Sequence, residues 1–232
     1  MSKSFKYEGH TRAKIIYLRY IKNMGNQTYS YANYMHYLAN ILKLKEFRQA
    51  RLWSFPENEG KVVFNFIKNN LNKKEIHGLQ IGGYLGVMHA FMVHNLIKLN
   101  PRNTLVTIDP NINTIPYNYY NITHQALTHF NLIKNSLLVL GRSENTHAFF
   151  RKNNMKFDFL FIDGNHEYEY AKNDFKFYEN LMRKKSLILF DDVHKNPKQC
   201  CDGPRKAVAE LVANGYKEIR ISPRCSCVVK KN

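Results

Sequence analysis

The 232-residue sequence predicts an α/β fold built on a mainly parallel, doubly wound sheet. After Pro56, short apolar runs alternate with segments of helical periodicity, as expected when a crossover helix follows each strand. The length suits one domain with a single substantial core. Parallel strands place their carboxyl ends at one edge of the sheet, where α/β proteins bind ligands. Five apolar runs end there on glycine or acid, at Gly82, Asp109, Gly141, Asp163 and Asp191-Asp192.

Residues 1–56 differ from the rest and predict a helical N-terminal segment. The stretch YSYANYMHYLANILKLKEF carries apolar residues at roughly helical spacing and is rich in tyrosine. This segment could serve as a lid or wall of a binding site, as a core-packing element or as a dimer contact. The tyrosines in question are Tyr29, Tyr31, Tyr34 and Tyr37.

Residues 57–232 predict the α/β domain itself. A helix begins after Pro56, and Gly215 is expected to end the last helix. The sequence predicts strands around 79–81 and at 105–109, 136–141, 157–163 and 186–192, helices at 87–99, 123–133, 170–182 and 204–215, and a closing pair of strands at 216–222 and 225–231.

The composition leaves two classes of partner open. The formal charge of +17, from 35 Lys and Arg against 18 Asp and Glu, would suit nucleic acid, but the basic residues are spread along the chain and not gathered in one arm. No apolar run of 18 residues and no secretory signal is present, so we expect a soluble cytoplasmic protein without a membrane partner. The four cysteines, Cys200, Cys201, Cys225 and Cys227, lack CxxC spacing and are expected to be reduced, unless two loops meet in a metal site.

The glycine-rich turn from Gly82 to Gly86 lies between a predicted strand and a predicted helix. Glycines there allow a tight turn and a close approach of a ligand to backbone N–H groups. The spacing is neither GxGxxG nor that of a phosphate-binding loop. Asp109 ends the next strand, where a carboxylate can accept both hydroxyls of a ribose. Together these features predict a nucleoside-bearing cofactor.

With the motif FIDGNH added, the sequence resembles class I S-adenosylmethionine-dependent methyltransferases. It is similar to metal-dependent O-methyltransferases of the catechol and caffeoyl-CoA type, and to sugar O-methyltransferases of the macrocin and aminocoumarin type. The resemblance covers residues from about 57 to 230 and is most specific in IGGYLGV, FDFLFIDGNHEYEY and LILFDDV. It implies a Rossmann-like class I methyltransferase fold with a seven-stranded sheet whose C-terminal strand, CSCVVKK, is antiparallel.

The resemblance also implies site residues. S-adenosyl-L-methionine would be bound by Gln80, Gly82, Gly83, Tyr84, Gly86, Asp109, Arg142, Ser143, Asp163 and His166. Mg²⁺ or another divalent ion would be bound by Asp163, Asp191 and Asp192, because hard cations prefer oxygen ligands. Alternatively, the last two acids cap a helix or pair with Lys195 and Lys198.

Three residues are candidates for the catalytic step. His166 occupies the place of the lysine base of catechol-type enzymes, and His194 beside the acidic pair is the rival base. Asp163 would hold the ion that activates the acceptor hydroxyl. The sequence departs from the family at Gln80, where an acid is usual, and at Asn165, where the sugar-methylating branch has a second acid.

The resemblance thus implies a divalent-metal-dependent O-methyltransferase acting on a small polyhydroxylated acceptor. A sugar or glycan hydroxyl is favoured over a catechol-like one, and a homodimer is compatible with the sequence. RNA methylation is a second hypothesis that rests on the charge. A catalytically inactive cofactor-binding scaffold is a third, motivated by Gln80 and Asn165.

Overall fold

A computed structural model describes residues 28–110, 118–194 and 202–230. The sheet has the strand order β3-β2-β1-β4-β5-β7-β6. The strands are β1 (His77–Ile81), β2 (Thr104–Asp109), β3 (Ser136–Leu140), β4 (Phe157–Ile162), β5 (Met182–Phe190), β6 (Tyr216–Arg220) and β7 (Ser226–Lys230). Strands β3, β2, β1, β4 and β5 pair in parallel, whereas β7 is antiparallel to both β5 and β6. The predicted fold class is confirmed, including the antiparallel C-terminal strand.

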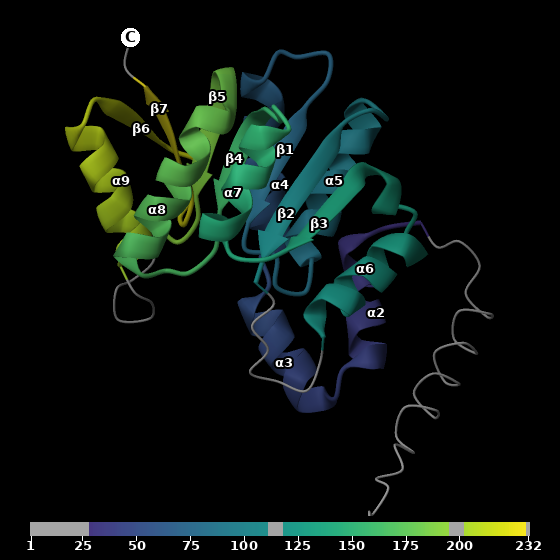
Figure 1. Ribbon diagram of the computed structural model, residues 1–232. Coiled ribbons are helices and arrows are strands. Elements are labelled where there is room, and N and C mark those ends of the chain that lie inside the picture. The colour runs from purple at the N-terminus through teal and green to yellow at the C-terminus, as the bar shows by residue number, and fades with distance from the viewer. Residues whose placement is uncertain (1–27, 111–117, 195–201, 231–232) are drawn as a thin grey trace, which may run out of the picture.

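The helices cover both faces of the sheet, as the alternation of strands and helices predicts (Figure 1). They are α2 (Tyr31–Ile41), α3 (Leu44–Trp53), α4 (Glu57–Asn70), α5 (Val87–Leu99), α6 (Tyr119–His129), α7 (Ser143–Lys152), α8 (Tyr168–Tyr178) and α9 (Gly203–Ala213). Buried side chains form two cores: one joins α2, α4, α5 and α6 to the sheet, and the other joins α7, α8 and α9 to its opposite face. None of the helices in the described residues is long and apolar enough to cross a membrane.

Several elements differ from the prediction. The helix expected at 170–182 ends at Tyr178, and the strand expected at 186–192 begins at Met182. The helix expected at 123–133 begins earlier, at Tyr119, because Asn118 caps it by accepting a hydrogen bond from the backbone N–H of Asn121 at 3.0 Å. Helix α7 is missing from the prediction. Its sequence SENTHAFFRK is largely polar, and its buried residues are Ser143 and Phe150, so it lacks the apolar stripe that marks a helix packed on a sheet.

The N-terminal tyrosines pack mainly into the core. Tyr29, Tyr34 and Tyr37 are buried, and each contacts the ring of Phe130, which directly follows α6. Tyr29 also lies against His94 of α5. The hydroxyl of Tyr34 donates a hydrogen bond of 2.8 Å to the backbone oxygen of Leu85, beside the glycine-rich turn. Tyr29, Tyr34 and Tyr37 therefore serve as core-packing residues, which is one of the three roles considered for the N-terminal segment.

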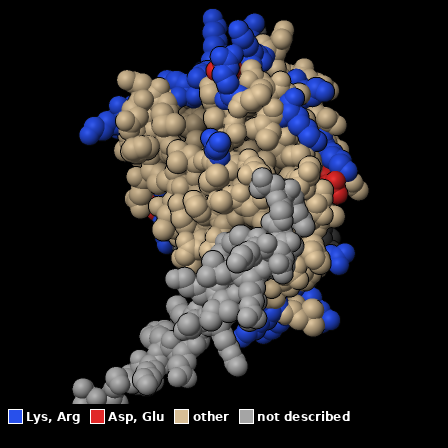
Figure 2. All heavy atoms as spheres, turned by 90° about the vertical axis from the view of Figure 1, so that its right-hand side faces the viewer, with Lys and Arg blue, Asp and Glu red and all other residues tan. Residues whose placement is uncertain are grey.

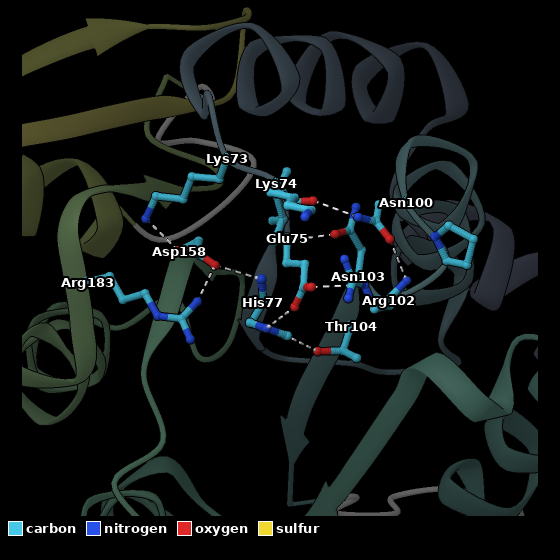
Figure 3. Close-up of polar contacts among 12 residues, drawn as sticks. Lys73, Lys74, Glu75, His77, Asn100, Arg102, Asn103, Thr104, Asp158 and Arg183 are labelled. Carbon is cyan, nitrogen blue, oxygen red and sulfur yellow. Dashed lines mark hydrogen bonds and ion pairs between the residues drawn. The ribbon is translucent and has the colours of Figure 1, made fainter.

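Lys73, His77, Asp158 and Arg183 form a polar cluster at the amino ends of the parallel strands (Figure 3). It is called here the amino-end cluster. The fully buried carboxylate of Asp158 on β4 binds Lys73 Nζ at 2.5 Å and Arg183 Nη1 at 2.8 Å. It also accepts a hydrogen bond of 2.8 Å from the backbone N–H of His77 on β1. One acid thus ties the start of β4 to its neighbours β1 and β5.

Candidate active site

The glycine-rich turn connects β1 to α5 at the carboxyl edge of the sheet. Gly82 has φ = 89°, and a Cβ atom at this position would lie 1.9 Å from the backbone oxygen of Asp163, so only glycine fits there. Asp109, at the end of β2, accepts hydrogen bonds from the backbone N–H groups of Gly83 at 2.7 Å and Tyr84 at 2.8 Å. The acid predicted to bind a ribose therefore also fixes the shape of the turn.

A cavity of about 630 Å³ opens beside this turn, a size typical of small-molecule sites. The ends of strands β1, β2 and β4 meet at this cavity, and Leu52, Ser54 and Phe55, which precede α4, line it as well. Among the predicted site residues, it is lined by Gln80, Gly82, Gly83, Tyr84, Asp109, Arg142, Ser143, Asp163, His166 and Asp192. The structure does not place Gly86, Asp191 or His194 in the lining.

The residues present in this cavity fit a nucleoside-bearing cofactor. Gln80 is 2% exposed, and its side-chain N–H donates to the backbone oxygen of Gly82 at 2.6 Å. Its carbonyl oxygen Oε1 has no hydrogen-bond partner among the described residues. A buried acceptor without a partner, beside a glycine turn and the Asp109 carboxylate, can be satisfied by a donor on a bound ligand.

His166 lies in the cavity between two acids. Its Nδ1 is 3.3 Å from Asp192 Oδ2, and its Nε2 is 3.7 Å from Asp163 Oδ1. A carboxylate beside one ring nitrogen orients the imidazole and stabilises the positive charge that the ring gains when it accepts a proton, as general-base catalysis requires. The predicted base and the predicted cofactor residues therefore share one cavity.

The acids predicted to bind a divalent ion are engaged by an arginine. Arg224, in the turn between β6 and β7, donates from Nε to Asp191 Oδ1 at 2.8 Å and from Nη2 to Asp191 Oδ2. The same Nη2 lies 2.9 Å from Asp192 Oδ1. No group of three or more His, Cys, Asp or Glu side chains in the described part of the chain is arranged to hold a metal. The residues at this position do not fit a divalent ion, because a guanidinium contacts the oxygens such an ion would need.

Arg224 stabilises the ionised form of a buried acid, Asp191. Asp191 is 1% exposed, and burial, together with the nearby Asp163, raises the pKa of the Asp191 carboxyl above its usual range. Arg224 opposes both effects, since its two N–H donors favour the ionised carboxylate. The thiol of Cys225 adds a third donor to Asp191 at 2.9 Å, so Cys225 is a reduced, buried side chain.

The rival base, His194, is directed toward the β6–β7 pair. Its Nε2 lies 2.7 Å from Ser226 Oγ and 3.3 Å from Glu218 Oε1. Burial lowers the pKa of His194, with Arg220 adding to this effect. Of the two candidate bases, His166 lines the cavity and His194 does not. Lys195, Lys198, Cys200 and Cys201 lie outside the described residues.

Sequence reasoning missed several lining residues. Asp174 on α8 accepts a hydrogen bond from the Ser143 hydroxyl, and burial raises the pKa of its carboxyl to about 6. A signal for it was present, since Asp174 shares the apolar face of α8 with Ala171 and Phe175 at helical spacing. No local signal marks Arg224, which reaches the acids across the sheet. The remaining lining residues that were missed include Leu52, Ser54, Phe55, Tyr119 and Tyr170.

Comparison with known families agrees with this geometry. Residues 79–193 match the family Methyltransf_24, described as a methyltransferase domain. This segment is a methyltransferase domain of that family. The matched segment begins in β1 and ends just after Asp191 and Asp192, so it includes the glycine-rich turn, Asp109, Asp163 and His166. Arg224 lies beyond it.

Several known proteins are similar to this chain over most of its length. The uncharacterised protein R132 of Acanthamoeba polyphaga mimivirus is 26% identical over 163 residues, which are 66% of this chain and 69% of that protein. An O-methyltransferase from Bacillus cereus, solved with SAH, has 16% identity and a TM-score of 0.63, covering 91% of this chain and 96% of the other. CalS11, a TDP-rhamnose 3′-O-methyltransferase of calicheamicin biosynthesis, has 15% identity and a TM-score of 0.59 over 97% and 96% of the two chains.

Proposed function

We propose that this methyltransferase transfers a methyl group from S-adenosylmethionine to a hydroxyl of a small polyhydroxylated acceptor, and that the acceptor is a sugar or glycan. The observation that carries the proposal is the position of His166, held between two carboxylates in the cavity that also contains the Asp109-braced glycine turn. A base and a cofactor site in one cavity are what methylation of a hydroxyl requires. The fold shared with O-methyltransferases supports it.

The cofactor would be bound at the carboxyl edge of the sheet. Asp109 supplies carboxylate acceptors for a ribose, and the turn beginning at Gly82 lets a ligand approach the backbone. Gln80 Oε1 offers a buried acceptor to the amino group. Arg142 and Ser143 would flank the adenine, with Asp174 beneath Ser143. When bound, S-adenosylmethionine supplies an electrophilic methyl group on a sulfonium.

His166 would take the proton from the acceptor hydroxyl. Asp192, beside Nδ1, favours the imidazolium that results. The acceptor oxygen forms its bond to the methyl carbon as the carbon–sulfur bond breaks, and the electron pair of that bond remains on sulfur. Asn165 also lines the cavity, but its neutral amide cannot take the proton, and its side-chain oxygen accepts a hydrogen bond of 2.9 Å from the backbone N–H of Glu167. A divalent ion is not part of the proposal, because Arg224 engages its predicted ligands.

The lining of the cavity favours a neutral, hydroxyl-rich acceptor over nucleic acid. It contains five acids and two arginines, and the acids are Asp109, Glu144, Asp163, Asp174 and Asp192. Carboxylates accept hydrogen bonds from hydroxyls but repel phosphates. On the face shown in Figure 2, Lys and Arg gather mostly at the top, which is the amino end of the parallel strands in Figure 1 and lies away from this cavity.

The N-terminal segment would supply part of the acceptor wall. Leu52 at the end of α3, Ser54 and Phe55 line the cavity, and Phe55 lies with its ring 4.7 Å from the Arg224 guanidinium carbon. Figure 1 shows α3 at the carboxyl edge of the sheet. The wall therefore comes from residues just after the tyrosine-rich helix, while that helix packs into the core.

A methyl-transfer assay tests the proposal. The full chain would be incubated with S-adenosylmethionine labelled in its methyl group and with panels of nucleotide-linked sugars, free glycans, catechols and RNA oligonucleotides. We expect label on a sugar hydroxyl and a loss of transfer in His166→Ala. Transfer to catechols or RNA in preference to every sugar would overturn the acceptor class. Cofactor binding without any transfer would favour the scaffold hypothesis.

A further inference from the structure

The Arg224 guanidinium lies against the pair of acids that follows β5. Its Nε and Nη2 contact Asp191 and Asp192 on the carboxyl edge of β5, and the group also lines the cavity. The Phe55 ring lies against it at 4.7 Å, which restricts the side chain from the other side. Arg224 is thus held by ion pairs and by an aromatic contact at once.

The partners of the two acids leave little room for a hard cation. Both oxygens of Asp191 and the Oδ1 of Asp192 face Arg224, and the Oδ2 of Asp192 faces His166 Nδ1 at 3.3 Å. Both oxygens of Asp191 therefore accept hydrogen bonds from Arg224, and the Asp192 carboxylate lies between Arg224 and His166. A divalent ion requires several such oxygens at about 2.0 to 2.6 Å and would have to displace the guanidinium.

We propose that Arg224 is the built-in cation of the acceptor site and that it replaces a divalent metal in this chain. The inference rests on the proposed function and deepens it. A guanidinium carries five N–H donors, and the contacts that the described residues make with Asp191 and Asp192 use Nε and Nη2. Nη1 is left to bind the acceptor oxygen as His166 removes its proton, so the positive charge stabilises the developing oxyanion.

A manganese titration of the full chain tests this without relying on activity. Free Mn²⁺ would be followed by electron paramagnetic resonance in wild type, in Arg224→Ala and in Arg220→Ala. Arg220 is an exposed arginine of the same hairpin that does not line the cavity, so its removal matches the loss of charge. We expect wild type and Arg220→Ala to bind Mn²⁺ no tighter than about 1 mM, the weak end for carboxylate sites. Arg224→Ala should bind one Mn²⁺ ion at least about tenfold more tightly than wild type, because the substitution removes the guanidinium that contacts Asp191 and Asp192.

Two further variants sharpen the result. Adding Asp192→Asn to Arg224→Ala should abolish the gained site, because it removes one of the uncovered carboxylates. Arg224→Lys should exclude Mn²⁺ as wild type does, since it keeps a positive charge at the same place. If Arg224→Ala does not fold, wild type and Arg224→Lys decide the matter. One Mn²⁺ bound by wild type below roughly 100 μM, and lost in Asp192→Asn, would overturn the inference.

The activity arm separates this inference from the proposed function. Methyl transfer by wild type in excess chelator should equal transfer in added Mg²⁺, and Arg224→Lys should transfer about tenfold more slowly or worse, because lysine lacks the planar fork. Transfer that requires added metal would reject the role of Arg224 while leaving the methyltransferase proposal intact. No transfer at all, with the expected Mn²⁺ pattern, would reject the proposed function and leave Arg224 as the cation that excludes metal.

Discussion

Buried acids pair with arginine at both ends of the sheet, but the ratio of cations to acids is reversed between the two ends. In the amino-end cluster, one carboxylate, Asp158, is shared by Lys73 and Arg183 (Figure 3). At the carboxyl end, Asp191 and Asp192 share one arginine, Arg224. The amino-end cluster has more cations than acids, and Asp158 does not line the large cavity. The carboxyl end has more acids than cations and faces that cavity.

The difference separates stabilisation from function. Asp158 has three donors, so its buried carboxylate is fully satisfied by the protein itself, as expected of a group that stabilises the fold. At the carboxyl end, two acids share one guanidinium, and Asp163 and Asp192 flank His166 in the cavity, as expected at a site of chemistry. The comparison teaches that a buried ion pair alone does not identify an active site, while an unbalanced one facing a cavity does.

The largest expected effect is on catalysis at the carboxyl end. His166→Ala should slow methyl transfer by roughly 10² to 10⁴-fold, the range for loss of a general base. Its melting temperature should change little, because the imidazole is partly exposed. The matched control is His36→Ala, which removes an exposed histidine from α2. Equal rates in single-turnover measurements of His166→Ala and wild type would contradict the assignment of the base.

The amino-end cluster should respond in the opposite way. Asp158→Ala should lower the free energy of unfolding by about 2 to 4 kcal/mol, because it leaves two cations and the His77 N–H without their buried acceptor. The rate of methyl transfer per folded molecule should not change. Urea denaturation gives the free energy, and Glu75→Ala, which breaks an exposed ion pair with Arg102 at the same end, should cost under about 1 kcal/mol.

Cofactor binding should depend on the acid at the end of β2. Asp109→Ala should weaken S-adenosylhomocysteine by about 1.5 to 3 kcal/mol, the range for hydrogen bonds to a charged group. Part of this loss comes from the turn, because the backbone N–H groups of Gly83 and Tyr84 lose their acceptor. Calorimetric titration measures the change. An unaltered affinity would place the ribose elsewhere.

A smaller effect concerns pH. Burial raises the pKa of Asp174 to about 6, so the folded chain retains a proton that the unfolded chain loses near its ordinary pKa of 3.8. Stability from this group is therefore present at low pH and falls as the pH rises from about 4 to 6. Relative to Asp174→Asn, which keeps an acceptor for Ser143, wild type should lose on the order of 2 kcal/mol across this window. Parallel pH profiles of the two proteins in urea would refute the shift.

The fold was largely predictable from the sequence because strands buried on both faces read as continuous apolar runs. Helix α5 matched its predicted bounds, Val87–Leu99, since its apolar residues and Pro101 mark both ends. Helix α7 was not predictable in this way, because it buries few side chains. The spacing of apolar residues in the sequence reflects which side chains are buried, so a helix that buries few side chains shows little such spacing.

The candidate site was predictable where local motifs define it. Gly82, Asp109, Asp163 and His166 line one cavity, as strand ends of a parallel sheet should. Arg224 was not predictable, because its contact with Asp191 joins residues 33 apart across an antiparallel strand. The contact depends on the register of β7 on β5. Charge pairing across a sheet is a property of the assembled fold.

The central claim is that the cavity at the carboxyl edge binds S-adenosylmethionine beside His166. A crystal structure of the full chain with S-adenosylhomocysteine tests it most directly. We expect the ligand to lie in this cavity, with its ribose at Asp109 and its sulfur toward His166, while Arg224 remains paired with Asp191. A ligand bound elsewhere, or no ligand at saturating concentration in a folded protein, would contradict it.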